Sequence, residues 1–109
     1  MSNRKLIATL AVVVIALVAL PAFADAGADG AALYKSKCAM CHGPDGSGQT
    51  PMGKSLKLKD LRSAEVQKMT DKELNTLISD GKGKMPAYKG KLSQAEIDAV
   101  VSFIRSIKK

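Results

Sequence analysis

The sequence predicts an all-α domain of about four helices, and three features support this fold class. Residues 70–73 (TDKE) and 93–96 (SQAE) are capping boxes, in which a threonine or serine is followed three residues later by glutamate. Apolar residues spaced three or four positions apart follow each box, as on one face of a helix. No segment after residue 25 alternates apolar and polar residues as a half-buried strand does.

The first two expected helices precede the first of these boxes. Asp29 or a neighbouring residue can begin a helix that continues toward Cys41. Glycines and prolines over residues 43–53 then predict a loop. Ser63 can cap a short helix over residues 64–69 (AEVQKM).

The third and fourth helices follow the two capping boxes. The third begins behind Thr70 and ends at Gly81, and a glycine-rich loop over residues 81–91 (GKGKMPAYKGK) comes next. The fourth begins behind Ser93. Its apolar stripe consists of Ile97, Val100, Val101 and Ile104, widened by Phe103 and Ile107. This spacing is that of an amphipathic helix with one buried face.

Residues 1–24 differ from the rest of the chain and predict a secretory signal peptide. Arg4 and Lys5 precede an uncharged apolar run over residues 6–20, which ends at a proline. Small residues at positions 22 and 24 fit the cleavage pattern, so cleavage is expected after position 24. The run is shorter than the roughly 18–20 residues that span a bilayer. We therefore expect a mature domain over residues 25–109 that is exported to the periplasm or another extracytoplasmic space and does not span the membrane.

The composition sets two further limits. The net charge is +7, and loss of Arg4 and Lys5 with the leader still leaves +5. The lysines are scattered through loops without interleaved aromatic residues, so no nucleic-acid partner is expected. A domain this small usually needs disulfides, a metal or another aid to stability. A bond between two cysteines spaced Cys-x-x-Cys would close only a tiny loop, so another group is expected in the core.

Both cysteines and the only histidine of the chain lie within residues 38–42 (CAMCH). Cys-x-x-Cys-His is the spacing of a c-type haem attachment site. One helical turn brings both thiols to the two vinyl groups of a haem, with which they form thioether bonds, and places the imidazole under the iron. We therefore predict one covalent haem c per chain, bound by Cys38 and Cys41, with His42 as an axial ligand. The porphyrin would supply the missing apolar core.

Three other interpretations of this motif fit less well. A thioredoxin-like redox pair would be expected near a parallel sheet, for which the sequence gives no indication. A structural zinc site needs about four ligands, and two cysteines with one histidine fall short of that number. An iron–sulfur cluster typically needs four cysteines.

A haem held by His42 needs a second axial ligand, and the chain has no second histidine. The methionines after the leader are Met40, Met52, Met69 and Met85. Met40 is held on the histidine side by the attachment turn. Met85 lies in the glycine-rich loop, and the following Pro86 stiffens it and disfavours helix there. Met85 is therefore the favoured ligand, with Met52 and Met69 as alternatives.

These motifs, in this order, make the chain similar to the class I c-type cytochromes, over essentially residues 30–107. Gly30 and Tyr34 resemble the glycine and aromatic residue of that family's N-terminal helix, and Val100 and Phe103 resemble the residues that this helix crosses. The segments CHGPDGSG and GKGKMPAY resemble the haem-binding and methionine loops. The resemblance implies a small cytochrome c fold, with the helices wrapped around one covalently bound haem.

The resemblance also implies contacts around the haem. The histidine of the family usually donates its other ring proton to a backbone carbonyl in the next loop, and Pro51 is the candidate acceptor here. The chain lacks the tryptophan that some relatives place against a haem propionate. Candidate propionate partners are Lys54, Lys59 and Arg62, although a solvated surface position would equally explain each of them.

An iron with six ligands has no open site for a substrate, so these features predict a one-electron carrier and not an enzyme. Transient redox partners are expected, and the carrier is expected to be a monomer. Lysines flank Met85 and could steer the carrier to acidic docking patches. These lysines are Lys82, Lys84, Lys89 and Lys91. Two alternatives remain open: a haem-based sensor or gas binder with a labile Met85, and an electron-entry subunit of an oxidase or dehydrogenase.

Overall fold

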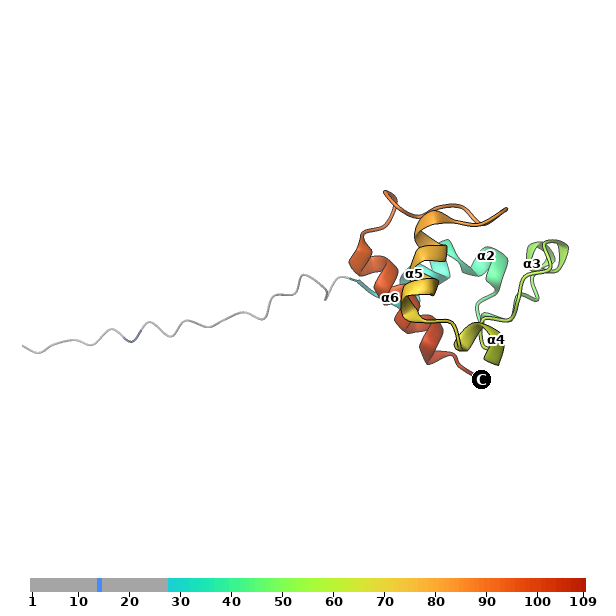
Figure 1. Ribbon diagram of the computed structural model, residues 1–109, viewed down its shortest axis with the longest axis horizontal. Helices are drawn as coiled ribbons and strands as arrows, with labels where there is room; N and C mark the ends of the chain where they lie inside the picture. The colour runs from blue at the N-terminus through green and yellow to red at the C-terminus, as the bar shows by residue number, and fades with distance from the viewer. Residues whose placement is uncertain (1–13, 15–27) are drawn as a thin grey trace, which may run out of the picture.

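The structure is a computed structural model that describes residue 14 and residues 28–109. Its helices are α1 (Gly30–Lys37), α2 (Ala39–His42), α3 (Pro51–Ser55), α4 (Ala64–Gln67), α5 (Asp71–Asp80) and α6 (Gln94–Ser106) (Figure 1). Within the described residues, β-structure is limited to two isolated bridges, which confirms the all-α prediction. The predicted signal peptide lies, apart from residue 14, outside the described residues. None of the described helices has the length and apolar character needed to cross a bilayer.

The predicted helix starts are confirmed by their caps. The Asp29 side chain accepts a hydrogen bond from the N–H of Ala32 at the start of α1. At the start of α5, the Thr70 hydroxyl accepts from the N–H of Glu73, and the Glu73 carboxylate accepts from the N–H of Thr70. Ser93 forms the same reciprocal pair with its glutamate at the start of α6. Each box satisfies two donors that a helix start otherwise leaves unpaired.

The structure differs from the prediction on either side of the attachment motif. The first helix does not run unbroken toward Cys41, because it ends at Lys37 and a separate turn, α2, follows Cys38. Residues 51–53, expected as loop, belong to the short helix α3, which extends over Pro51–Ser55. Its start has a physical basis, since the Thr50 hydroxyl caps it and Pro51 occupies the first turn, where no N–H is needed.

The core lies where α1 crosses α6 and α5 packs beside α6 (Figure 1). A side chain at Gly30 would overlap the backbone of Ala99, so only glycine permits this close crossing. One turn further on, the rings of Tyr34 and Phe103 lie 4.6 Å apart between centroids. Both observations confirm the expected contact between the first and last helices. The most deeply buried apolar residues of α5 and α6 are Leu74, Ile78, Ile97, Val100, Val101 and Ile104.

Arg105 joins α6 to the turn between α4 and α5. Its guanidinium donates to the carbonyls of Gln67 and Met69 and pairs with Asp71 at 2.8 Å. The Gln67 amide in turn donates to the carbonyls of Leu61 and Ile104. These bonds place the segment before α5 against the end of α6, and so fix one side of the cavity described below.

Candidate haem-binding site

The attachment motif lies in one turn of helix at the edge of a cavity. The N–H groups of Cys41 and His42 both donate to the carbonyl of Cys38, at 3.2 and 2.9 Å. This turn places both thiols and the imidazole on the lining of the same cavity. Cys38 and Cys41 are free, partly exposed thiols, and thiols must be free and accessible to form thioether bonds.

The protonation states at this site argue against thiol redox chemistry. Burial, with a smaller contribution from Cys41, raises the pKa of the Cys38 thiol to about 11. Redox-active Cys-x-x-Cys pairs have the opposite property, a lowered pKa that yields a thiolate. Burial lowers the pKa of His42, so the imidazole is neutral at pH 7, as a metal ligand must be. Within the described part of the chain no three His, Cys, Asp or Glu side chains gather as a metal cluster.

The wall behind His42, which we call the proximal wall, consists of α2, residues 43–50 and α3. The N–H of Gly48 donates to the carbonyl of His42 at 2.7 Å, and the Thr50 hydroxyl donates to the carbonyl of Cys41 at 2.6 Å. The Nδ1 atom of His42 is buried and has no hydrogen-bond partner. Pro51 begins α3, and no bond between its carbonyl and this atom is present, so the Pro51 contact stays a prediction.

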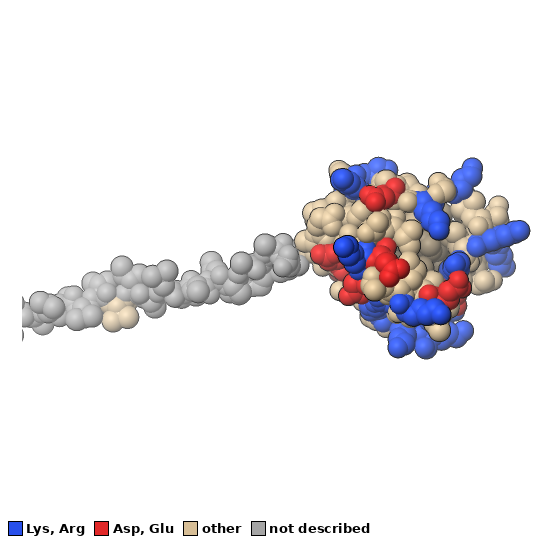
Figure 2. Space-filling view, viewed as in Figure 1, with Lys and Arg blue, Asp and Glu red and all other residues tan. Residues whose placement is uncertain are grey.

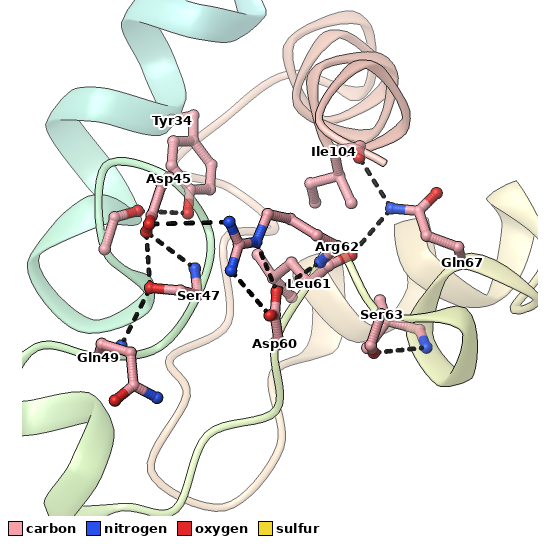
Figure 3. A network of polar contacts seen from close by, with 12 residues as sticks. Tyr34, Asp45, Ser47, Gln49, Asp60, Leu61, Arg62, Ser63, Gln67 and Ile104 are labelled. Atoms are coloured by element: carbon pink, nitrogen blue, oxygen red, sulfur yellow. Dashed lines mark hydrogen bonds and ion pairs between the residues drawn. The ribbon is translucent and has the colours of Figure 1, made fainter. Parts of the chain in front are cut away.

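A polar network holds the proximal wall to the next segment of the chain (Figure 3). The Tyr34 hydroxyl donates to the carbonyl of Gly43 at 2.6 Å. The Asp45 carboxylate accepts from both the N–H and the hydroxyl of Ser47, at 3.0 and 2.7 Å. Arg62 donates to both oxygens of Asp60, at 2.9 and 3.0 Å, and lies 3.9 Å from Asp45.

Residues 81–91 form the opposite wall, which we call the distal wall. Met85 and Lys82 exchange two backbone hydrogen bonds, at 2.9 and 3.1 Å, and so close a tight turn. A side chain at Gly81 would lie 2.6 Å from the carbonyl oxygen of Met85, so glycine is needed where the loop returns. Tyr88 attaches the loop to the end of α5, because its N–H donates to the carbonyl of Ile78 at 3.0 Å.

Two adjoining cavities of about 390 and 350 Å³ lie between the walls, within the size range of cofactor sites. Cys38, His42 and Met85 line both of them. We call the first of these the outer cavity; Cys41 and Lys37 line only this cavity, and its opening to solvent is the mouth of the site. The inner cavity is mostly apolar and reaches the core through Val66, Met69, Leu74, Leu77, Ile78, Val100 and Ile104.

The four methionines differ in their positions relative to the two cavities. Met85 lines both cavities, whereas Met69 lines only the inner one, where it packs against the core. Met52 is 48% exposed in α3 and lines neither cavity. Met40 is 81% exposed in the attachment turn. Among these methionines, Met85 is the one that lines both cavities together with Cys38 and His42, and its role as a ligand stays a prediction.

The basic residues near the cavity differ from those expected. Arg62 is engaged with Asp60 and Asp45, and Lys54 does not line either cavity. Lys59 lines both cavities and also pairs with Glu65 at 2.8 Å, so it is the remaining candidate for a propionate contact.

Five lysines line the outer cavity: Lys37, Lys57, Lys59, Lys82 and Lys84. Lys89 and Lys91, which were also expected there, do not line it. Sequence reasoning missed both Lys37 and Lys57: Lys37 directly precedes Cys38 and could have been found from the motif, whereas only the fold brings Lys57 to the mouth.

The residues present fit a haem. Two thiols, a neutral imidazole and a thioether face the same cavity, and these are the groups that thioether attachment and axial ligation require. The inner lining is apolar and the mouth is basic, which suits the apolar porphyrin and its carboxylates.

Comparisons with known proteins agree with this geometry. Residues 25–104 match the family described as "Cytochrome C oxidase, cbb3-type, subunit III". The chain is 32% identical over 105 residues to a cytochrome c6 of Synechococcus sp. (strain ATCC 27167 / PCC 6312), a match that covers 93% of this chain and 90% of the relative. It is 37% identical over 81 residues to a cytochrome c6 of Leptolyngbya boryana, covering 74% and 91% of the two chains.

Solved structures show the same likeness. The KustC0563 c-type cytochrome superposes with a TM-score of 0.69 at 36% identity, covering 74% of this chain and 99% of the other. Cytochrome c6C of Synechococcus sp. PCC 7002 superposes with a TM-score of 0.57 at 31% identity, covering 72% and 92%.

The fold and the site define a small helical protein with one covalently bound haem c. The chain belongs to the c-type cytochromes, and it is an electron carrier, not an enzyme.

Proposed function

We propose that this carrier holds its haem through Cys38 and Cys41, with His42 and Met85 as the axial ligands, and exchanges single electrons with extracytoplasmic redox partners. The observation that carries this proposal is that residues 43 positions apart, His42 and Met85, line the same two cavities together with Cys38. When bound, the haem supplies an Fe(III)/Fe(II) couple, and a soft thioether ligand favours the reduced state.

The protein's own groups have separate tasks in this proposal. The two thioether bonds keep the cofactor in a domain too small to enclose it fully. Burial keeps the His42 imidazole neutral, and the Pro51 carbonyl is the proposed acceptor for its second ring proton. The tight turn at Lys82 and Met85 holds the backbone of Met85 in place before binding, which limits the reorganisation that accompanies electron transfer.

Replacement of Met85 tests the ligand assignment. The oxidised holoprotein should show the weak near-infrared band of sulfur-to-iron charge transfer. Met85→Ala should abolish that band, lower the reduction potential, and allow carbon monoxide to bind the reduced protein.

Met52→Ala and Met69→Ala are matched controls for this experiment. Both should keep the band. Met69→Ala should also lower the free energy of unfolding, because Met69 packs against the core; the range for a buried methionine is about 2–5 kcal/mol. Loss of the band in either control, with Met85→Ala unchanged, would mean that Met85 is the wrong ligand.

Export is part of the proposal. Residues 1–24 would act as a signal peptide and residues 25–109 would form the mature domain. N-terminal sequencing of the holoprotein should start at Asp25 or within a few residues of it. A holoprotein that starts at Met1 would refute export with cleavage.

We further propose that the basic mouth of the outer cavity docks on acidic patches of redox partners. Lys82 and Lys84 of the distal wall line the outer cavity together with Lys57 and Lys59, which come from another segment of the chain. Figure 2 shows that basic side chains also occur elsewhere on the surface, so a general charge effect needs a control.

The paired change Lys82→Glu/Lys84→Glu should slow electron transfer to an acidic acceptor and weaken the dependence of the rate on salt. Lys68→Glu/Lys72→Glu is the matched control, because it makes the same change of charge at exposed positions away from the cavities. Equal slowing by both pairs would show that net charge, and not docking at the mouth, sets the rate.

The two alternative functions make different predictions. A sensor with a labile ligand would bind carbon monoxide in the unmodified reduced protein, whereas the carrier should not. The matched family description favours testing the oxidase-subunit alternative as well. Sedimentation of the exported holoprotein should give the mass of a free monomer, and a stable larger assembly would favour the subunit.

A further inference from the structure

One side chain joins the distal wall to the end of α1. The Tyr88 hydroxyl donates to the carbonyl of Lys37 at 2.9 Å, between residues 51 positions apart. Among the described residues, it is the one hydrogen bond between residues 81–92 and residues 29–42. Both partners lie on the lining of the outer cavity, so the bond closes one edge of the site.

The Lys37 carbonyl is available because the helix breaks at Cys38. In a continuous helix the N–H of Cys41 would donate to Lys37, four residues before it. Instead, that N–H donates to the carbonyl of Cys38 at 3.2 Å, and no backbone N–H in the described chain donates to Lys37. The Tyr88 hydroxyl supplies the missing donor, as the end of a helix requires.

Tyr88 is well placed to transmit this restraint to Met85. Its N–H is bonded to the carbonyl of Ile78 at the end of α5, and its ring packs against the core. The Lys91 ammonium lies 5.8 Å from the ring centroid on its own loop. Tyr88 is therefore bonded to α5 through its backbone N–H and to the end of α1 through its hydroxyl. The hydroxyl bond adds a restraint between α1 and the loop that carries Met85.

We propose that Tyr88 is a positioning residue that keeps Met85 at the iron by tying the distal wall to the Lys37 carbonyl. The bond opposes the outward movement of the loop that must accompany dissociation of the methionine. This inference rests on the proposed function, since it requires Met85 to be the ligand.

The test measures how fast Met85 leaves the ferric iron in the holoprotein. With saturating imidazole as competitor, the rate of ligand exchange equals the rate of methionine dissociation, and loss of the near-infrared band reports it. Tyr88→Phe removes the hydroxyl and keeps the ring. It should raise the saturating rate about threefold, or ~0.7 kcal/mol, which is near the lower end for a hydrogen bond because this one is exposed to solvent.

Tyr34→Phe is the matched control, because the Tyr34 hydroxyl also donates to a backbone carbonyl, that of Gly43 on the proximal wall. It should lower the melting temperature and leave the exchange rate unchanged. An unchanged rate in Tyr88→Phe, or an equal acceleration in both variants, overturns the positioning role. Absence of the near-infrared band from the unmodified protein would instead overturn the Met85 ligand itself, so the two failures are distinguishable.

Discussion

The proximal and distal walls face each other across one cavity, yet they are built differently. On the proximal wall, side-chain contacts join separate segments, because the Tyr34 hydroxyl donates to the carbonyl of Gly43 and Arg62 lies 3.9 Å from Asp45 (Figure 3). The Thr50 hydroxyl adds a bond to the carbonyl of Cys41. On the distal wall, Met85 is held by a single tight turn, by backbone bonds at Tyr88 and Lys89, and by the one side-chain bond from the Tyr88 hydroxyl to the Lys37 carbonyl.

The difference has a consequence for function. Covalent attachment and a dense network make the histidine side rigid, whereas the methionine side depends on few bonds. Regions with few contacts and exposed hydrogen bonds are those that open most easily. The distal ligand should therefore be the first to detach, and each change below distinguishes loss of the whole fold from loss of that ligand.

The largest effect should follow removal of both thioether bonds. Cys38→Ala/Cys41→Ala leaves a cavity between the walls with an apolar inner lining and no covalently retained porphyrin. A domain of this size has little other core, so both walls should lose their order. Circular dichroism should show no cooperative thermal transition in the purified variant. A cooperative transition like that of the holoprotein would show that the polypeptide core suffices by itself.

The proximal wall should be sensitive to Gly53→Ala. A side chain at Gly53 would overlap the carbonyls of Gly48 and Cys41, which are backbone atoms and cannot turn aside. Overpacking of this kind costs about 1–3 kcal/mol. Denaturant unfolding of the holoprotein should show this loss, while the near-infrared band stays. Loss of the band with full stability would mean that the two walls do not separate in this way.

The distal wall should respond in the opposite manner to Gly81→Ala. Gly81 has a φ of 72° and a ψ of 174°, a region that essentially only glycine adopts and where strain costs about 1–3 kcal/mol, and it lies against the Met85 carbonyl. The strain should move the loop, so imidazole should displace Met85 at lower concentration than in the unmodified protein. The measurement is an imidazole titration of the oxidised holoprotein. An unchanged midpoint with lower stability would show that the strain spreads through the fold without reaching the ligand.

How far the sequence predicts each wall follows from the range of the contacts. The capping boxes at Thr70 and Ser93 depend on residues close in sequence, and the predicted starts of α5 and α6 are confirmed. The helix α3 was missed although Thr50 and Pro51 favour a helix start there, because the glycines and prolines of this segment were interpreted as a loop. The bond from the Thr50 hydroxyl to the carbonyl of Cys41 forms only after the chain has folded back on itself.

The distal wall shows the same limit. Met85 was predicted as a ligand from its loop and from the lack of other ligands; it lines the cavity, and its ligand role stays a prediction. The bond from Tyr88 to Lys37 spans 51 positions and depends on a helix break that the sequence did not reveal. The basic residues of the mouth were predicted only from the loop over residues 81–91, so Lys37 and Lys57, which lie on other segments, were missed.

Acid should weaken the proximal wall through its carboxylates. Hydrogen bonds from Ser47 hold the pKa of Asp45 below its usual value, and hydrogen bonds from Arg62 do the same for the pKa of Asp60. A carboxyl with a lowered folded pKa stabilises the fold above its unfolded pKa of about 3.9, and this contribution disappears as the pH falls through the folded pKa.

Thermal melts of the holoprotein from about pH 6 to about pH 3 should therefore show a loss of stability at the acid end. Arg62→Gln should make the loss smaller, because it removes the partner that lowers the pKa of Asp60. An equal loss in both proteins would place the acid-sensitive groups elsewhere.

The smallest effect should come from Lys57, which lies at the mouth between the two walls. It is the one residue other than glycine with a positive φ, 54°, in the described chain, and its side chain is exposed. Lys57→Gly should relieve a backbone cost of about 1–2 kcal/mol and lose about 0.5–1 kcal/mol through the freer unfolded chain. The expected result is a gain of up to ~1.5 kcal/mol in the free energy of unfolding, measured by denaturant, with the near-infrared band and the imidazole midpoint unchanged. Lys59→Gly is the control at an exposed neighbour outside the left-handed region, and it should only destabilise. A loss of stability in Lys57→Gly would mean that contacts of the lysine side chain at the cavity mouth outweigh the strain in its backbone.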